Sequence, residues 1–248
     1  MADWRFDGFD AAGLAAHLAL PACELHERVG STMDVAHAAA ERGAPAGTLI
    51  LADAQDAGRG RGGKRWASLP GRGLWMTLIE RPQSPRGLEV LSLRIGLLLA
   101  DALDPVAGGR VGLKWPNDLF VAGRKLAGTL VEARWRDQRV EWIAIGIGLN
   151  VTVPHGVEEA AGMAPGTTRL AALERVMPAL RVAAQGEGPL TDGEVERFMA
   201  RDISIGRRVV QPAVGVVAGI SAAGELMVNT GAACVACRSG SLVFAEEE

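Results

Sequence analysis

The 248-residue sequence contains no tyrosine, and only 4% of its residues are aromatic. Its three cysteines are too few for a disulfide framework, so we expect a reducing compartment, the cytoplasm. The pair Cys234 and Cys237 lacks the second pair that a zinc site needs. No uncharged stretch can cross a bilayer, and the N-terminus lacks the apolar core of a secretory signal. The net charge of -3 gives no general attraction to nucleic acid.

With 48% hydrophobic residues, the chain can bury a core, and its patterning predicts an α+β fold. Ser31 and Gly43 are typical of the start and end of a helix. We expect a mixed or antiparallel sheet with flanking helices over 1–203 and a small all-β domain over 204–248. The predicted strands are 47–52, 74–80, 111–115, 119–121, 125–135 and 139–151, and the other predicted helices are 88–103, 168–176 and 191–201.

Residues 53–73, which include the segment QDAGRGRGGKRW from Gln55 to Trp66, have no helix or strand periodicity and are expected to form a long loop, here called the Gly-Arg loop. Its glycines formally match the dinucleotide-binding fingerprint and nearly match a phosphate-binding P-loop. Both motifs require a helix directly afterwards, and Pro70 with further glycines prevents one. Arg65 also stands where the P-loop needs Ser or Thr. We therefore reject both motifs.

The same loop is strongly basic and has no acidic residue after Asp56. Arginine binds phosphate through a planar fork, and glycine lets the backbone approach a ligand. Trp66 adds a flat face that can cover a purine ring. The alternatives are a solvated basic loop with Trp66 as a core anchor, or a nucleic-acid site, which a single aromatic residue disfavours. The cations are Arg59, Arg61, Lys64, Arg65 and Arg72.

A second polar group lies between apolar strands in LKWPNDLFVAGRKLAG, residues 113–128. Such groups beside buried strands are costly unless they pair with each other or with a ligand. Lys114 and Lys125 can stabilise negative charge on phosphate, and Asp118 can hold a cation or position a lysine. The alternative is a tight turn at Asn117, with Lys125 at an exposed hairpin tip.

The strand IAIGIGLN, which Asn150 ends, carries two glycines on one face. Gly146 and Gly148 leave this face without side chains and so permit a close approach by backbone or ligand. A β-bulge is an equally good explanation of two strand glycines.

Together these motifs resemble the biotin protein ligase family. The resemblance covers roughly residues 31–151 and is carried by GSTMD, QDAGRGRGGKRW, LKWPNDLFVAGRKLAGTLVEA and GIGLNV, in the family's order and spacing. It implies the biotin/lipoate ligase fold for 1–203 and a barrel-like β domain for 204–248. Because the first motif starts at Ser31, we expect no helix-turn-helix repressor domain and no operator binding.

The resemblance implies a two-step activity. The carboxylate of biotin attacks the α-phosphate of ATP, giving biotinyl-5'-AMP and pyrophosphate, and a lysine of a biotin carboxyl carrier protein then attacks the mixed anhydride. We therefore expect biotin and ATP with Mg²⁺ as substrates, and no tightly bound cofactor. The expected protein partner is the carrier, with neither DNA nor a membrane, and a homodimer is left open.

By resemblance, the residues with direct chemical roles are Lys125, Arg59 and Arg61, and Lys125 bridges the carboxylate and the α-phosphate. The implied biotin contacts are Ser31, Thr32, Gln55, Arg59, Gly60, Arg61, Lys125 and Gly128. The implied nucleotide contacts are Arg59, Arg61, Trp66, Lys114, Asn117, Asp118, Lys125 and Asn150. Trp66 would stack near adenine, and Asp118 is the candidate ligand of Mg²⁺.

Two positions depart from the family pattern, because Met33 stands where Asn is frequent and Gly62 where a basic residue is frequent. The second departure predicts a looser grip on the adenylate. One rival interpretation is a lipoate ligase or octanoyl transferase of the same fold, which the Gly-Arg loop and KWPND disfavour. Another is a non-catalytic biotin or nucleotide sensor, which the presence of Lys125 and Arg59 disfavours.

Overall fold

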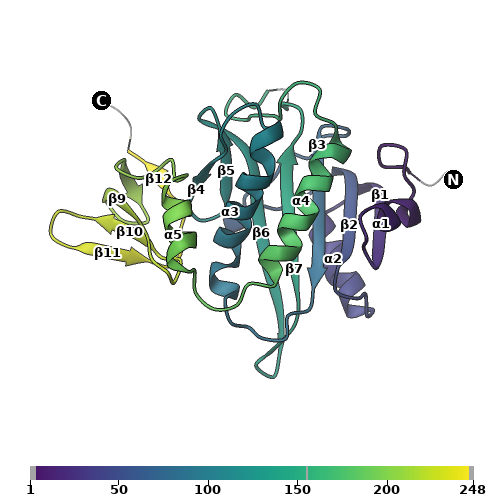
Figure 1. Cartoon of the computed structure of the whole chain (residues 1–248), viewed down its shortest axis with the longest axis horizontal. Coiled ribbons are helices and arrows are strands. Elements are labelled where there is room, and N and C mark those ends of the chain that lie inside the picture. The colour runs from purple at the N-terminus through teal and green to yellow at the C-terminus, as the bar shows by residue number, and fades with distance from the viewer. Residues whose placement is uncertain (1–3, 155, 246–248) are drawn as a thin grey trace.

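The computed structural model describes residues 4–154 and 156–245, which form two β-sheets with helices around the larger one (Figure 1). The larger sheet has the strand order β1-β2-β3-β7-β6-β5-β4. Only β1 and β2 pair in parallel, so the predicted mixed sheet is confirmed. Its strands are β1 (Ala22–Val29), β2 (Thr48–Gln55), β3 (Gly73–Glu80), β4 (Gly112–Lys114), β5 (Asp118–Val121), β6 (Arg124–Arg136) and β7 (Arg139–Asn150).

Helices cover both faces of this sheet because its central strands are apolar on both sides. On β2, Leu49 and Leu51 belong to the large core under α3 and α4, whereas Ile50 packs with α2 on the opposite face. In the described ranges no helix is long and apolar enough to cross a membrane. The helices are α1 (Ala11–His17), α2 (Thr32–Glu41), α3 (Leu91–Leu103), α4 (Arg169–Ala184) and α5 (Asp192–Met199), with single turns at Arg61–Gly63, Leu88–Val90 and Asp104–Val106.

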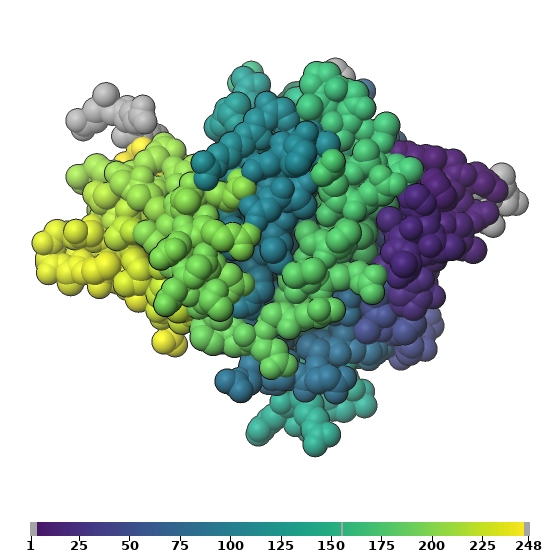
Figure 2. Space-filling view, viewed as in Figure 1, coloured from purple at the N-terminus to yellow at the C-terminus, as the bar shows by residue number. Residues whose placement is uncertain are grey.

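The smaller sheet is antiparallel, has the order β11-β10-β9-β8-β12, and forms one end of the elongated molecule (Figure 2). The outer strands β11 and β12 do not pair in the described residues, so the sheet is open and the expected barrel-like closure is wrong. The predicted boundary between residues 203 and 204 stays a prediction. The strands are β8 (Arg208–Gln211), β9 (Gly215–Ile220), β10 (Leu226–Asn229), β11 (Cys234–Cys237) and β12 (Val243–Phe244).

The two cysteines at the ends of β11 are not placed to form a disulfide. Residues three apart along a strand are separated by about 10 Å, and a disulfide requires less than about 7 Å between Cα atoms. Cys234 and Cys237 are both free thiols. No cluster of three or more potential metal ligands occurs in the described part of the chain.

An ion pair in the core region joins α3 to α5. Arg94, only 5% exposed, donates from Nε to Glu194 Oε1 at 2.6 Å and from Nη2 to Oε2 at 3.2 Å. The hydrogen bond from Arg94 is the main reason that the pKa of Glu194 lies below its usual value. Glu194 also completes a capping box with Thr191 at the start of α5.

We expect Arg94→Met to lower the free energy of unfolding by about 3 kcal/mol at neutral pH, because it leaves the Glu194 carboxylate without its charged partner. Because the pKa of Glu194 is lowered on folding, the stabilisation exists above the unfolded pKa and is lost as the pH falls through the folded pKa. Urea denaturation at pH 7 and in acid measures this, with Arg139→Met on the exposed β6–β7 hairpin as control. An equal effect of Arg94→Met at both pH values would contradict the assignment.

Candidate active site

A pocket of about 180 Å³ opens on the face of the large sheet that α2 also covers. Its floor is formed by β3, β6 and β7, and its walls by the start of α2, the Gly-Arg loop and the β4–β5 turn. The segment 240–242 before β12 closes one side. Every site residue expected from the sequence lines it except Asn150: Ser31, Thr32, Gln55, Arg59, Gly60, Arg61, Trp66, Lys114, Asn117, Asp118, Lys125 and Gly128.

One end of the pocket holds a connected set of hydrogen-bonding side chains. Gln55 Oε1 accepts from the Thr32 backbone N–H at 2.8 Å and from Thr32 Oγ1 at 3.1 Å. Thr77 Oγ1 donates to Thr32 Oγ1 at 2.9 Å, and Gln55 Nε2 donates to Ser68 Oγ at 2.7 Å. The network fixes these side chains, so the polar end is preorganised for a ligand with donors and acceptors.

Thr77 and Ser68 were not among the residues expected from the sequence. The signal for Thr77 is a single polar residue in the otherwise apolar strand LWMTLIE, where it is fully buried. Buried hydroxyls require partners, so a threonine at such a position indicates a polar neighbour across the sheet face. Nothing in the local sequence of Ser68 distinguishes it from an ordinary loop residue.

The glycines of β6 and β7 admit large side chains close to the sheet. A Cβ at Gly148 would lie 2.5 Å from the Trp66 ring, and one at Gly146 would lie 2.8 Å from Met33 Cε. A Cβ at Gly128 would also meet Trp66, at 3.1 Å. The β6–β7 register is regular at these positions and shifts only near Trp135. The β-bulge is therefore wrong, and the close approach that these glycines permit is made by the Trp66 and Met33 side chains, while approach by a ligand stays a prediction.

Gly148→Ala is expected to destabilise the protein by about 1–3 kcal/mol, because the new methyl group overlaps the Trp66 ring and forces it out of its seat. Thermal unfolding measures the change. The control is Gly30→Ala, where no atom lies within 4 Å of the added Cβ and φ is not positive. Equal stability of the two variants would show that the Trp66 ring does not pack against Gly148.

Lys125, at the start of β6, points into the pocket and is not at a solvated hairpin tip. Its Nζ lies 2.7 Å from Asp118 Oδ1 and 5.1 Å from the centre of the Trp66 ring. Its backbone is held on the other side, where its N–H donates to the Glu159 carbonyl and its carbonyl accepts from Ala161 N–H. The two hydrogen bonds to the 159–161 segment hold the backbone of Lys125, and the ion pair with Asp118 holds its ammonium group.

The opposite end of the pocket is strongly cationic. In the described residues, Asp118 is the one carboxylate in the lining. Burial lowers the pKa of Lys114 below its usual value. Neighbouring cations lower it further, whereas Asp118 raises it. Burial likewise lowers the pKa of Arg61. Such a surplus of positive charge favours a ligand with several negative charges. The lining cations are Arg59, Arg61, Lys64, Arg65, Lys114 and Lys125.

The smaller sheet contributes to this site, a role that the sequence had left open. Arg61 Nη1 donates to the Gly240 carbonyl at 2.8 Å, and its guanidinium lies 5.8 Å from the Trp115 ring centre. Trp115 Nε1 in turn donates to the Gly224 carbonyl at 3.0 Å. The Gly-Arg loop therefore touches the C-terminal segment as well as the large sheet.

Two asparagines have structural partners. Asn117 Nδ2 donates to the Thr129 carbonyl at 2.6 Å, so this pocket residue ties the β4–β5 turn to β6. Asn150 is buried outside the lining, and its Nδ2 lies 3.4 Å from the Lys125 carbonyl. Direct contact of Asn150 with a nucleotide stays a prediction, and in this structure its position is behind Lys125.

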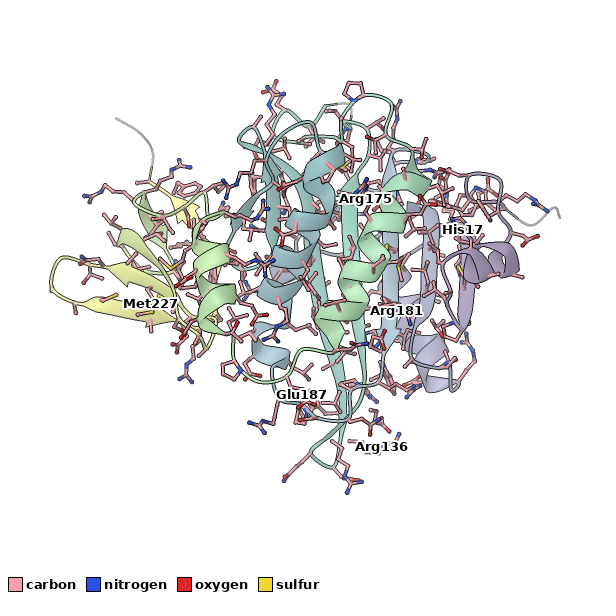
Figure 3. The ribbon with its side chains drawn as sticks, in the orientation of Figure 1. His17, Arg136, Arg175, Arg181, Glu187 and Met227 are labelled. Carbon is pink, nitrogen blue, oxygen red and sulfur yellow. The ribbon has the colours of Figure 1, made fainter. Side chains whose placement is uncertain are left out.

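A second hollow, of about 440 Å³, lies at the far end of β3 beside the end of α4, where Arg181 and Glu187 are labelled in Figure 3. Its acids, Glu80 and Glu187, roughly balance its arginines, and none of the motif residues lines it. Although it is the larger cavity, it has neither the charge surplus nor the preorganised polar end of the first pocket. We therefore place the site in the first pocket.

Comparison with known proteins identifies the family. The sequence model of the biotin/lipoate A/B protein ligase family matches residues 25–150. The biotin–[acetyl-CoA-carboxylase] ligase of Mycobacterium tuberculosis is 31% identical over 219 residues, which cover 79% of each chain. The bifunctional ligase/repressor BirA of Bacillus subtilis is 41% identical over 127 residues, covering 51% of this chain and 39% of BirA.

Solved structures agree on the fold. The biotin protein ligase of Aquifex aeolicus in complex with biotin and ATP superposes with a TM-score of 0.74 at 24% identity, covering 90% of this chain and 99% of that one. The matches to BirA proteins span well under half of those relatives' length. The family model and the similarity to the mycobacterial ligase, which covers 79% of each chain, show the family. The chain belongs to the biotin/lipoate A/B protein ligase family.

Proposed function

We propose that this protein activates biotin with ATP to biotinyl-5'-AMP and transfers the biotinyl group to a lysine of a biotin carboxyl carrier protein. The observation that carries the proposal is the division of one pocket into a hydrogen-bonding end and a cationic end, with Lys125 at the cationic end. A ligand with a polar head group and a carboxylate fits the hydrogen-bonding end, and a nucleoside triphosphate fits the cationic end. The mycobacterial relative carries the name of this activity.

In the first step a carboxylate oxygen of biotin forms a bond to the α-phosphorus, and the bond from that phosphorus to pyrophosphate breaks. Both reactants are anions and repel each other, so the protein must neutralise them where they meet. Lys125 is held by its backbone between β5 and the 159–161 segment, and Asp118 pairs with its ammonium group. We assign to Lys125 the contact that bridges the two reacting groups.

The arginines of the loop have the second role. Arg59 and Arg61 line the pocket from a glycine-rich segment, which can close over a ligand without large conformational strain. A closed loop keeps water from the mixed anhydride, and its cations hold the phosphate until a carrier lysine arrives. The lysine amine then attacks the acyl carbon, AMP leaves, and the amine loses a proton.

The head group of biotin is assigned to the Thr32, Gln55 and Thr77 end. Its ring system has donors and acceptors that match these side chains, and the wall formed by Met33 and Leu130 accepts its apolar body. Trp66 lies over the glycines between the two ends, where it can contact biotin or adenine. Stacking of Trp66 on adenine remains part of the proposal.

The residues present are compatible with a magnesium ion that arrives with ATP. Mg²⁺ is usually held by phosphate oxygens, waters and one or two carboxylates, and Asp118 is the carboxylate in the lining that the described chain offers. The ion would supply additional charge neutralisation on the phosphates. Asp118 also holds Lys125, so it positions that ammonium group whether or not an ion is bound.

The proposal is tested with a purified biotin carboxyl carrier domain, biotin and ATP. The expected result is ATP-dependent incorporation of one biotin per carrier, and none into a carrier whose acceptor lysine is replaced by arginine. Mass spectrometry of the carrier measures this. Incorporation that does not require ATP, or none at all with active ATP and folded protein, would overturn the proposal.

A further inference from the structure

A chain of hydrogen bonds leads from the sheet to the Gly-Arg loop. Trp142 Nε1 donates to His37 Nδ1 at 3.0 Å. An indole N–H can only donate, so Nδ1 must be the unprotonated nitrogen of the imidazole and Nε2 must carry the proton. His37 Nε2 lies 2.9 Å from Glu132 Oε2 and therefore donates to it. His37 on α2 and Trp142 on β7 therefore orient the carboxylate of Glu132.

Glu132 in turn meets Arg59. Arg59 Nη2 lies 3.5 Å from Glu132 Oε2 and 2.9 Å from Oδ1 of Asp34, which is in the first turn of α2. Both acids thus use the same guanidinium nitrogen. Within the described chain no partner is bonded to Nε or Nη1 of Arg59, although Arg59 lines the pocket. The arginine can keep this anchor and still present two other donor groups to a ligand.

The position of Glu132 on β6 explains why it can act on the site. It follows Gly128 and Leu130, both in the pocket lining, at the alternating positions that share one face of the strand. Glu132 itself lies one step beyond the pocket, and its side chain is about one-third exposed. It therefore touches the loop arginine and does not line the ligand cavity.

We propose that Glu132, oriented by His37 and Trp142, is a positioning residue that docks the Gly-Arg loop through Arg59 and so prepares the pocket for its ligands. Without this anchor the loop must lose more conformational freedom on binding, and the ligand affinity falls by that amount. The effect on substrate binding rests on the function proposed above. The effect on the mobility of the Gly-Arg loop is independent of that function.

The loop contains Arg59, Arg61, Lys64 and Arg65, so trypsin reports its mobility directly. In the ligand-free protein, Glu132→Gln is expected to raise the rate of cleavage within 59–65 by about fivefold, which corresponds to the loss of a partly exposed ion pair. Asp34→Asn, which changes an exposed acid, should also raise the rate of cleavage. Glu41→Gln, which changes an exposed acid at the end of α2, is the control and should leave the rate unchanged.

Thermal unfolding of each variant separates loop release from general destabilisation, and Asp34→Asn keeps the test valid if Glu132→Gln fails to fold. Unchanged cleavage in both folded variants would overturn the proposal. In the biotin-dependent pyrophosphate assay, Glu132→Gln should raise KM for biotin about fivefold with kcat nearly unchanged. A fall in kcat with unchanged KM would also contradict a positioning role. If the wild type releases no pyrophosphate, the proposed function fails while the cleavage result still decides the anchor.

Discussion

Lys125→Ala is expected to reduce biotin-dependent pyrophosphate release by about 10³-fold while the fold stays intact. Removing a preorganised group that stabilises charge in the transition state costs about this much in other enzymes. Here the ammonium group lies 2.7 Å from Asp118, and two backbone hydrogen bonds to the 159–161 segment hold the residue. The variant would leave Asp118 as an unpaired acid in a pocket that must bind anions, which adds to the loss.

The matched control is Arg124→Ala, which removes an exposed cation from the adjacent position of the same strand. It should release pyrophosphate at nearly the wild-type rate, and both variants should unfold at similar temperatures. If Lys125→Ala releases pyrophosphate as fast as Arg124→Ala, Lys125 does not contact the reacting groups.

The second large expected effect concerns which carboxylic acid the protein activates. Octanoate should replace biotin with a kcat/KM lower by about 10⁴-fold, because a site built to hydrogen-bond its substrate rejects an analogue that leaves those groups unpaired. The relevant groups are Thr32, Gln55 and Thr77, which are connected to each other at the polar end, where Thr32 and Thr77 are buried and Gln55 is partly buried. Pyrophosphate release with each acid at several concentrations measures the ratio.

A variant makes this test specific to the polar end. Thr77→Val preserves the shape of the side chain and removes its hydroxyl, so it should lower kcat/KM for biotin about tenfold and leave octanoate unchanged. Thr48→Val is the control, since its hydroxyl donates to the Pro45 carbonyl in the turn just before β2, away from the pocket. Faster turnover of octanoate or lipoate than of biotin by the wild type would show that the rival ligase of the same fold is correct.

The arrangement of the site could be predicted from sequence because its chemistry is carried by local motifs. Ser31 starts α2 as its N-cap, and Lys125 follows a two-residue turn in which Ala122 and Gly123 both have positive φ. Both features depend on residues near in sequence. The β5–β6 hairpin and α2 therefore lie where the patterning predicted them.

Other features depend on contacts between distant segments. The helix predicted to end at residue 176 continues as α4 to Ala184 through Pro178, because Leu180 and Ala183 are buried against the core on the same face. Proline normally ends a helix, and tertiary packing outweighs that preference here. The contribution of Gly240 to the pocket could not be predicted either, since this residue lies 179 positions along the chain from Arg61, whose side chain it contacts.

The neighbours of the loop arginines show the same limit. The sequence indicates that Arg59 and Arg61 are cationic and mobile, and it gives no sign that Asp34 and Glu132 both reach Arg59 Nη2. Those acids lie on α2 and β6, far along the chain, and only the packing of α2 against the sheet brings them together. A loop rich in glycine thus gains a defined anchor from tertiary structure.

The most direct test of the account is to mix the protein with biotin and ATP without any carrier, quench with acid, and quantify biotinyl-5'-AMP by chromatography. We expect the wild type to retain about one molecule of adenylate per active site, and Lys125→Ala to retain none above background. Wild-type protein that binds biotin and ATP but forms no adenylate, or Lys125→Ala that retains as much as the wild type, would contradict it.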